Sequence, residues 1–122
     1  MNEFATVLNC MDGRTQPPVA DYLADSFGAR YVDTITTAGT VHHLAADTDQ
    51  TGTLLSNLAV SVDKHGSSQI AVVAHHDCAG NPVFDETQQN QVRDAVSRLG
   101  ALYPDAEIIG LWIDRDWGVN RL

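Results

Sequence analysis

The sequence predicts an α/β fold: a mostly parallel sheet of four to five strands, flanked by helices on both faces. Apolar, β-branched runs alternate along the chain with stretches in which apolar residues recur at helical spacing. Strands joined through helices require right-handed crossovers, and these place helices on both faces of the sheet. No repeat, low-complexity tract or long linker interrupts the pattern, so residues 1–122 are expected to form a single domain.

The first third of the chain supplies two expected strands and one helix. Residues 4–9 are mostly apolar and form the first strand. A helix follows from Pro17 to about Phe27, because proline is tolerated in the first helical turn and Gly28 provides a C-terminal stop. Residues 31–35 form the second strand.

The middle of the chain begins with a tight loop at residues 37–40. A helix is expected over residues 51–64, where apolar side chains recur at helical spacing and Gly66 ends the run. Residues 69–74 are apolar almost without interruption, which is typical of a strand buried on both faces.

The last part of the chain adds one helix and one strand. The helix covers residues 86–102 and is broken by Pro104 and Asp105. Residues 107–113 form the fourth strand, and a turn follows at residues 116–118. Trp112 and Trp117 are expected to lie in the core or in a subunit contact.

Charge and hydropathy exclude two classes of partner. The net charge is −9, and a negative surface repels phosphate backbones, so no nucleic acid is expected as a partner. No apolar run approaches the roughly 20 residues of a membrane span, so no membrane is expected either. No basic segment followed by an apolar stretch begins the sequence, so the protein is expected to be cytoplasmic. Two cysteines in that setting argue against a structural disulfide.

Both cysteines lie directly after or close to the ends of expected strands. Cys10 follows the first strand, and His75 and Cys78 follow the third. If these strands are parallel neighbours, their carboxyl ends meet where α/β sheets bind ligands. Two sulfurs and one imidazole nitrogen then form a tetrahedral Zn²⁺ site with its fourth position open, as catalytic zinc sites have. A water bound there becomes a nucleophile for a small electrophilic carbon.

Asp12 and Arg14 follow Cys10 closely, and two roles fit Asp12. Its carboxylate either occupies the fourth zinc position or is held by Arg14 through a forked hydrogen bond. In the second case it accepts a proton from the zinc-bound water. The alternative is a surface ion pair of little energetic value.

The motifs Cys10-x-Asp12-x-Arg14 and His75-x-x-Cys78 resemble the two signature motifs of the β-class carbonic anhydrases. The likeness covers most of the chain. It continues in residues 31–40, 61–80 and 108–118.

This resemblance implies a function and a set of site residues. It implies reversible, zinc-dependent hydration of carbon dioxide to bicarbonate by a metal-bound hydroxide. It places Cys10, His75 and Cys78 on zinc and makes Asp12 and Arg14 the catalytic pair. In some members of the family the aspartate moves onto the metal at lower pH. Members are dimers or larger, so a homodimer or higher homo-oligomer is expected.

Departures from the family pattern keep other readings open. Thr36, Thr37 and Thr40 stand where the family commonly carries Arg-Asn and Asn around an Ala-Gly loop. The N-terminal helical arm is absent, and the segment after Gly80 is short. One alternative is therefore a zinc-binding relative that acts as a binding or regulatory module. Another is hydrolysis of a carbon dioxide analogue, carbonyl sulfide or carbon disulfide. A thiol redox protein is the weakest reading, because there is no C-x-x-C.

Three histidines have no assigned role. His76 is expected to point away from the metal, either as a proton carrier at the pocket rim or as a solvated side chain. His42 and His43 follow the Ala-Gly loop and either approach the site or are plain loop residues.

Overall fold

The structure is a computed structural model that describes residues 3–122. Its centre is a five-stranded sheet with the strand order β2-β1-β3-β4-β5. Four strands are parallel and β5 is antiparallel to β4, which confirms the predicted mostly parallel sheet. The strands are β1 (Phe4–Cys10), β2 (Tyr31–Thr37), β3 (Gln69–His75), β4 (Glu107–Ile113) and β5 (Val119–Arg121).

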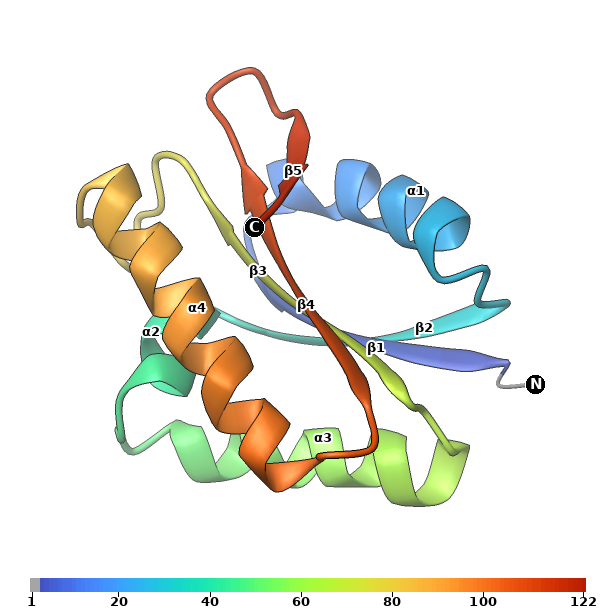
Figure 1. Cartoon of the computed structure of the whole chain (residues 1–122). Coiled ribbons are helices and arrows are strands. Elements are labelled where there is room, and N and C mark those ends of the chain that lie inside the picture. Colours follow the sequence, from blue (N-terminus) through green and yellow to red (C-terminus); the bar gives the residue numbers. More distant parts are fainter. Residues whose placement is uncertain (1–2) are drawn as a thin grey trace.

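Helices cover both faces of this sheet, as predicted (Figure 1). One face is covered by α1, and the other by α2, α3 and α4, since these helices supply the side chains of two separate apolar clusters. The helices are α1 (Gln16–Ser26), α2 (Thr40–Ala45), α3 (Thr51–His65) and α4 (Asp85–Leu102), and a 3-10 turn η1 (Gly13–Thr15) precedes α1.

The two clusters share the sheet as their common wall. Strand β3 contributes to both, because Val72 faces the α2–α3–α4 side and Val73 faces the α1 side. Both valines are almost fully buried, and each such side chain contributes about 1.5–3 kcal/mol relative to an exposed one. The unbroken apolar run of β3 therefore reflects burial on both faces.

The segment after β2 differs from the prediction of a tight loop at residues 37–40. Strand β2 continues to Thr37, and the short helix α2, which the sequence did not predict, begins at Thr40. Gly39 has a left-handed φ of 64° at the helix N-terminus, a conformation that glycine adopts without steric cost. The Thr40 hydroxyl donates to the Asn9 carbonyl at 2.6 Å and accepts from the Thr37 amide at 2.9 Å. These two contacts fix the start of α2 against the end of β1.

The sheet brings the carboxyl ends of β1 and β3 together. The two strands are parallel neighbours, with Thr6 opposite Ile70 and Leu8 opposite Val72. Cys10 and His75, the last residues of these strands, consequently lie at the same edge. Within residues 3–122, no helix has both the length and the apolar character needed to cross a membrane.

Candidate metal centre

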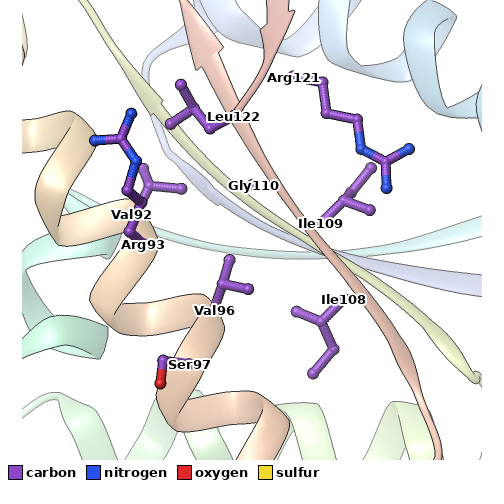
Figure 2. Close-up of a pocket in the computed structure, with 9 residues that line it drawn as sticks. All are labelled: Val92, Arg93, Val96, Ser97, Ile108, Ile109, Gly110, Arg121 and Leu122. Atoms are coloured by element: carbon purple, nitrogen blue, oxygen red, sulfur yellow. The ribbon is translucent and has the colours of Figure 1, made fainter.

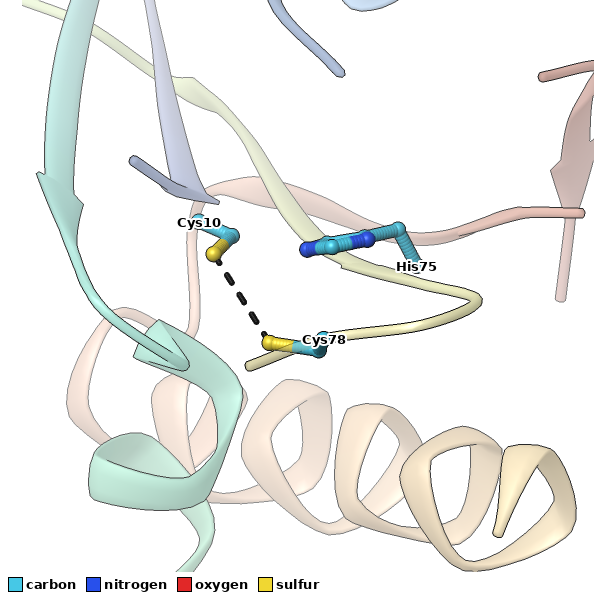
Figure 3. A group of neighbouring side chains, drawn as sticks. All are labelled: Cys10, His75 and Cys78. Carbon is cyan, nitrogen blue, oxygen red and sulfur yellow. Dashed lines mark hydrogen bonds between the residues drawn. The ribbon is translucent and has the colours of Figure 1, made fainter. Parts of the chain in front are cut away.

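Cys10, His75 and Cys78 converge at the edge of the sheet (Figure 3). Their ligand atoms all lie within 4.8 Å of one another, and the two sulfurs are 3.8 Å apart. The three residues are 5%, 0% and 5% exposed, and neither cysteine forms a disulfide. The structure thus joins three side chains from two distant segments in one buried cluster.

The His75 ring is oriented by its own turn. Its Nδ1 lies 2.8 Å from the His76 carbonyl, which can only accept a hydrogen bond. Nδ1 therefore carries the hydrogen, and Nε2 offers a lone pair. Nε2 is buried and has no hydrogen-bond partner among the described residues. A buried nitrogen with a free lone pair beside two sulfurs fits a metal ligand.

The two thiols share a proton unequally. The Cys78 thiol beside it lowers the pKa of Cys10 to about 4, against the effect of burial. The pKa of Cys78 is raised, first by its hydrogen bond with Cys10 and second by burial. The hydrogen bond between the two sulfurs thus favours one thiolate beside one thiol, and a divalent cation favours loss of the second proton.

The electrostatic surroundings of His75 are those of a cation site. Burial favours the neutral ring, but the Cys10 sulfur, the His76 carbonyl and the Asp12 carboxylate favour the imidazolium more, so the pKa of His75 is raised. The same negative groups would attract a metal cation. Two sulfurs and one imidazole nitrogen match the donors that zinc prefers, with a fourth position left.

Gly39 and Gly80 contact each other next to the cluster. Gly39 lies in the turn before α2, and its amide donates to the Cys10 sulfur at 3.5 Å. A Cβ added to Gly39 would lie 2.5 Å from the Gly80 carbonyl oxygen, and one added to Gly80 would lie 2.6 Å from the Ala38 carbonyl carbon. The backbone of the turn that follows Cys78 therefore packs directly against the backbone of the turn before α2.

Asp12 and Arg14 form a forked ion pair next to the cluster. Arg14 Nη2 lies 2.6 Å from Asp12 Oδ2, and Arg14 Nε reaches both carboxylate oxygens at 3.1 and 3.2 Å. This contact with Arg14 lowers the pKa of Asp12 to about 2. Asp12 Oδ2 is 3.9 Å from His75 Nε2. Of the two arrangements considered for Asp12, the structure has the one in which Arg14 holds it.

Arg14 has two further partners that the sequence analysis missed. Asp77 accepts from Arg14 through its carboxylate at 3.3 Å and through its carbonyl at 3.1 Å. The Trp117 ring lies 4.6 Å from the guanidinium carbon, at cation–π distance. The sequence marked a turn around Trp117 but gave no signal that this turn reaches Arg14.

Helix α4 holds the turn between His75 and Asn81, a contact that was also not predicted. Gln88 is 1% exposed, and its Nε2 donates to the His75 carbonyl at 2.8 Å. One turn further along, Gln91 accepts from the Asn81 side chain at 2.7 Å. Two glutamines at helical spacing in a polar helix carry no distinctive signal of such a role.

The three histidines without an assigned role lie outside the cluster. His76 Nδ1 is 2.9 Å from the Asp85 carboxylate at the start of α4. His43 Nδ1 contacts the Thr48 hydroxyl at 2.7 Å, and His42 packs against the edge of the His43 ring. The expectation that His42 and His43 lie in a loop was wrong, because both belong to α2.

Two cavities differ in their relation to the cluster. One of about 750 Å³ borders the Cys78 turn and is lined by Cys78, His76 and the exposed Phe84, among others. Another, of about 250 Å³, lies between α4 and β4, with Val96 and Ile108 in its wall (Figure 2). No cysteine, histidine or acidic side chain of the described residues lines the second cavity, so it does not belong to the cluster.

Comparison with known proteins identifies the class of this protein. A family model described as "Putative carbonic anhydrase" matches residues 1–122. The chain therefore belongs to this family of carbonic anhydrases, which are enzymes of the carbonate dehydratase class. A search of curated protein sequences gave no match.

Solved structures show the same fold at low sequence identity. A carbonic anhydrase from Streptococcus mutans is 19% identical, with a TM-score of 0.66 over 99% of this chain and 84% of that one. A tetrameric β-carbonic anhydrase from Sordaria macrospora is 12% identical, with a TM-score of 0.65 over 100% and 82% of the chains. The apo form of a carbon disulfide hydrolase is 16% identical, with a TM-score of 0.65 over 98% and 77%. The resemblance of the predicted fold to β-carbonic anhydrases is thus confirmed.

Proposed function

We propose that this protein catalyses the reversible hydration of carbon dioxide to bicarbonate at a zinc ion held by Cys10, His75 and Cys78. The observation that carries the proposal is the buried cluster itself, in which His75 Nε2 faces two sulfurs and has no hydrogen-bond partner within residues 3–122. Membership of the carbonic anhydrase family supports it independently.

Each group near the cluster has a task in this reaction. Zinc, when bound, supplies a Lewis acid that activates water at neutral pH. The contact with Arg14 lowers the pKa of Asp12 to about 2, so its carboxylate is ionised at neutral pH and would be able to accept a hydrogen bond from water at the metal position. Arg14 holds the carboxylate with one edge of its guanidinium, through Nε and Nη2, and so fixes the orientation of the carboxylate.

A second candidate function uses the same cluster on a different substrate. One solved structure with this fold is a carbon disulfide hydrolase. Carbon disulfide and carbonyl sulfide are linear molecules with an electrophilic carbon, as carbon dioxide is, so the same activated water can attack any of them. Access to the metal decides among them, and one cavity, of about 750 Å³, borders the cluster at Cys78.

We further propose that the chain acts as one domain in a cytoplasmic homodimer or higher homo-oligomer. Large apolar side chains flank the cluster on its outer side, with Met11 62% exposed and Phe84 86% exposed. Exposed apolar groups beside a site favour coverage by another subunit. One β-carbonic anhydrase with this fold is described as tetrameric, which agrees with the proposal.

The test compares the parent protein with Asp12→Asn and with Asp25→Asn, an exposed aspartate on α1. Metal content is measured on each, and carbon dioxide hydration is followed by stopped flow. We expect one zinc per chain in all three and fast turnover in the parent and in Asp25→Asn. Asp12→Asn should lose turnover by about 10²-fold or more, as expected for loss of a group that acts in proton transfer.

The same preparation separates the alternatives. Zinc binding without hydration of carbon dioxide, but with hydrolysis of carbon disulfide or carbonyl sulfide, would favour the second candidate. Zinc binding without any of these activities would favour a binding or regulatory module. Absence of zinc after refolding with the metal would overturn the proposal.

A further inference from the structure

Two residues stand out by their backbone conformation. Among residues 3–122, only Asp77 and Trp117 combine a positive φ with a side chain, at 59° and 63°. This left-handed region crowds the Cβ of an L-residue, and such strain persists only where the surroundings enforce it. The two residues belong to different turns, yet both contact the guanidinium of Arg14.

Together with Asp12, these residues enclose Arg14 on three sides. Asp12 binds Nε and Nη2, and Asp77 binds Nη1 with its carboxylate and Nη2 with its carbonyl. The guanidinium carbon of Arg14 lies over the Trp117 ring, 4.6 Å from its centroid. The hydrogen bonds are directional, whereas the ring attracts the cation as a whole, so the two kinds of contact restrain Arg14 in different ways.

The turn that carries Trp117 is itself tightly organised. The Asp114 carboxylate accepts from the amides of Asp116 and Gly118 at 2.9 and 3.0 Å, and from the Asn120 side chain at 2.9 Å. The Trp117 amide donates to the Asp114 carbonyl at 3.0 Å. The left-handed conformation of Trp117 is thus enforced by a closed set of hydrogen bonds between β4 and β5.

We propose that Trp117 and Asp77 are positioning residues that hold Arg14 in one place and, through Arg14, keep the Asp12 carboxylate off the metal position. This inference rests on the proposed function of the cluster, since it assigns these residues a role in that site. Arg14 is 47% exposed on its side chain, and an exposed arginine without such contacts samples many rotamers. Asp12 Oδ2 lies only 3.9 Å from His75 Nε2, so a carboxylate released by Arg14 has a short path to the metal position.

A purely structural role for Trp117 makes a different prediction. The ring packs against the apolar cluster under α1, as the side chain of Val119 also does. If packing were its whole contribution, loss of the ring and loss of comparable apolar volume nearby would have the same effect on the site.

The experiment uses the full-length, metal-loaded protein and four variants. Trp117→Gly removes the ring and suits the positive φ, whereas Trp117→Phe keeps an aromatic face. Asp77→Asn keeps the carbonyl and tolerates the left-handed conformation but removes the charge. Val119→Ala removes packing from the same cluster without touching Arg14.

Three readouts are measured on each variant. Solvent exchange of the Arg14 Nε–H is followed by NMR on zinc-loaded protein, the visible spectrum is recorded after substitution with cobalt(II), and carbon dioxide hydration gives kcat. The exchange rate reports how firmly the side chain of Arg14 is held in its hydrogen bonds. The cobalt spectrum reports whether a carboxylate coordinates the metal. Neither depends on turnover.

In Trp117→Gly we expect Arg14 Nε–H exchange to accelerate about tenfold, because a group that is no longer held opens more often. The cobalt spectrum should change toward a fourth protein ligand, and kcat should fall about tenfold or more. Trp117→Phe should restore each readout most of the way to its parental value. Asp77→Asn should give changes of intermediate size, and Val119→Ala should match the parent.

Parental exchange and parental spectra in both Trp117→Gly and Asp77→Asn would overturn the proposal, as would equal effects in Val119→Ala. If Trp117→Gly does not fold, Asp77→Asn decides the question alone. A parent protein that does not hydrate carbon dioxide would refute the proposed function, whereas the NMR and cobalt measurements would still test the hold on Arg14.

Discussion

The backbones of Gly39 and Gly80 touch, and neither position has room for a side chain. A Cβ on Gly39 would lie 2.5 Å from the Gly80 oxygen, and one on Gly80 would lie 2.6 Å from the Gly39 nitrogen. Gly39 also donates to the Cys10 sulfur, and Gly80 lies two residues after Cys78. This contact therefore joins the turn that hydrogen-bonds Cys10 to the turn that carries Cys78.

Gly80→Ala and Gly39→Ala should each destabilise the protein by about 2 kcal/mol or more, because backbone atoms must move to admit the methyl group. Each should also weaken zinc binding, since the sulfurs move apart. Chemical denaturation and competition with a chelator measure the two effects. Gly100→Ala is the control: it lies in α4 with open space around it and should raise stability by about 0.5–1 kcal/mol. Parental stability in Gly80→Ala would show that the contact is not tight.

The Asp12–Arg14 pair should contribute stability that depends on pH with a definite sign. Contact with Arg14 lowers the pKa of Asp12 from 3.8 to about 2. A carboxylate whose pKa is lowered on folding stabilises the folded state at every pH above its pKa in the unfolded chain. That stabilisation is lost as the pH falls to its pKa in the folded protein. We measure the free energy of unfolding by urea denaturation with a chelator present. The parent should therefore be more stable than Asp12→Asn above pH 4, and the two proteins should have nearly the same free energy of unfolding near pH 2. A constant difference across this range would contradict the assignment.

Gln88 should influence metal affinity although it touches no donor atom of the cluster. Its side chain holds the His75 carbonyl from α4, and Gln88→Leu would leave that carbonyl without this donor. We expect a loss of about 1–2 kcal/mol in stability and about tenfold in zinc affinity, as is common for groups that orient ligands. Competition with a chromophoric chelator measures the affinity. The neighbouring Gln89→Leu is the control, and equal affinities in the two variants would refute the role.

A buried hydroxyl network ties α3 to the sheet away from the metal cluster. The Thr6 hydroxyl donates to Ser67 at 2.7 Å and lies 2.5 Å from Ser61 Oγ, which in turn donates to Asp33 at 2.7 Å. Thr6→Val keeps the shape but removes these hydrogen bonds, and it should cost about 1–3 kcal/mol.

The matched control for Thr6→Val is Thr34→Val on the exposed face of the edge strand β2, which should change stability by about 0.5 kcal/mol or less. Thermal unfolding of both variants measures the difference. Similar stabilities would show that the Thr6 network contributes little.

The strands and the approach of Cys10 to His75 and Cys78 were accessible from sequence for a physical reason. Buried parallel strands need continuous apolar runs, and such runs mark their own ends. Because parallel neighbours end at one edge, the polar residues that follow them are brought together. The five-stranded sheet confirms the predicted fold class. The role of the three side chains as zinc ligands stays a prediction.

The missed features depend on contacts between distant residues. Helix α2 has six residues and no room for a helical repeat, and its start is fixed by the Thr40 hydroxyl on the Asn9 carbonyl. The contact of Arg14 with Trp117 joins the 3-10 turn after β1 to the turn after β4. No local pattern encodes either contact, because each arises only when the sheet is assembled.

The separation of the two cysteines has a consequence for the order of events during synthesis. Cys10 and Cys78 are 68 positions apart, so the first thiol leaves the ribosome long before its companion and before His75. If these residues hold zinc as proposed, a nascent chain offers only the Cys10 sulfur to the metal until the third strand and its following turn emerge. Metal loading would then require that this much of the polypeptide has been translated and folded.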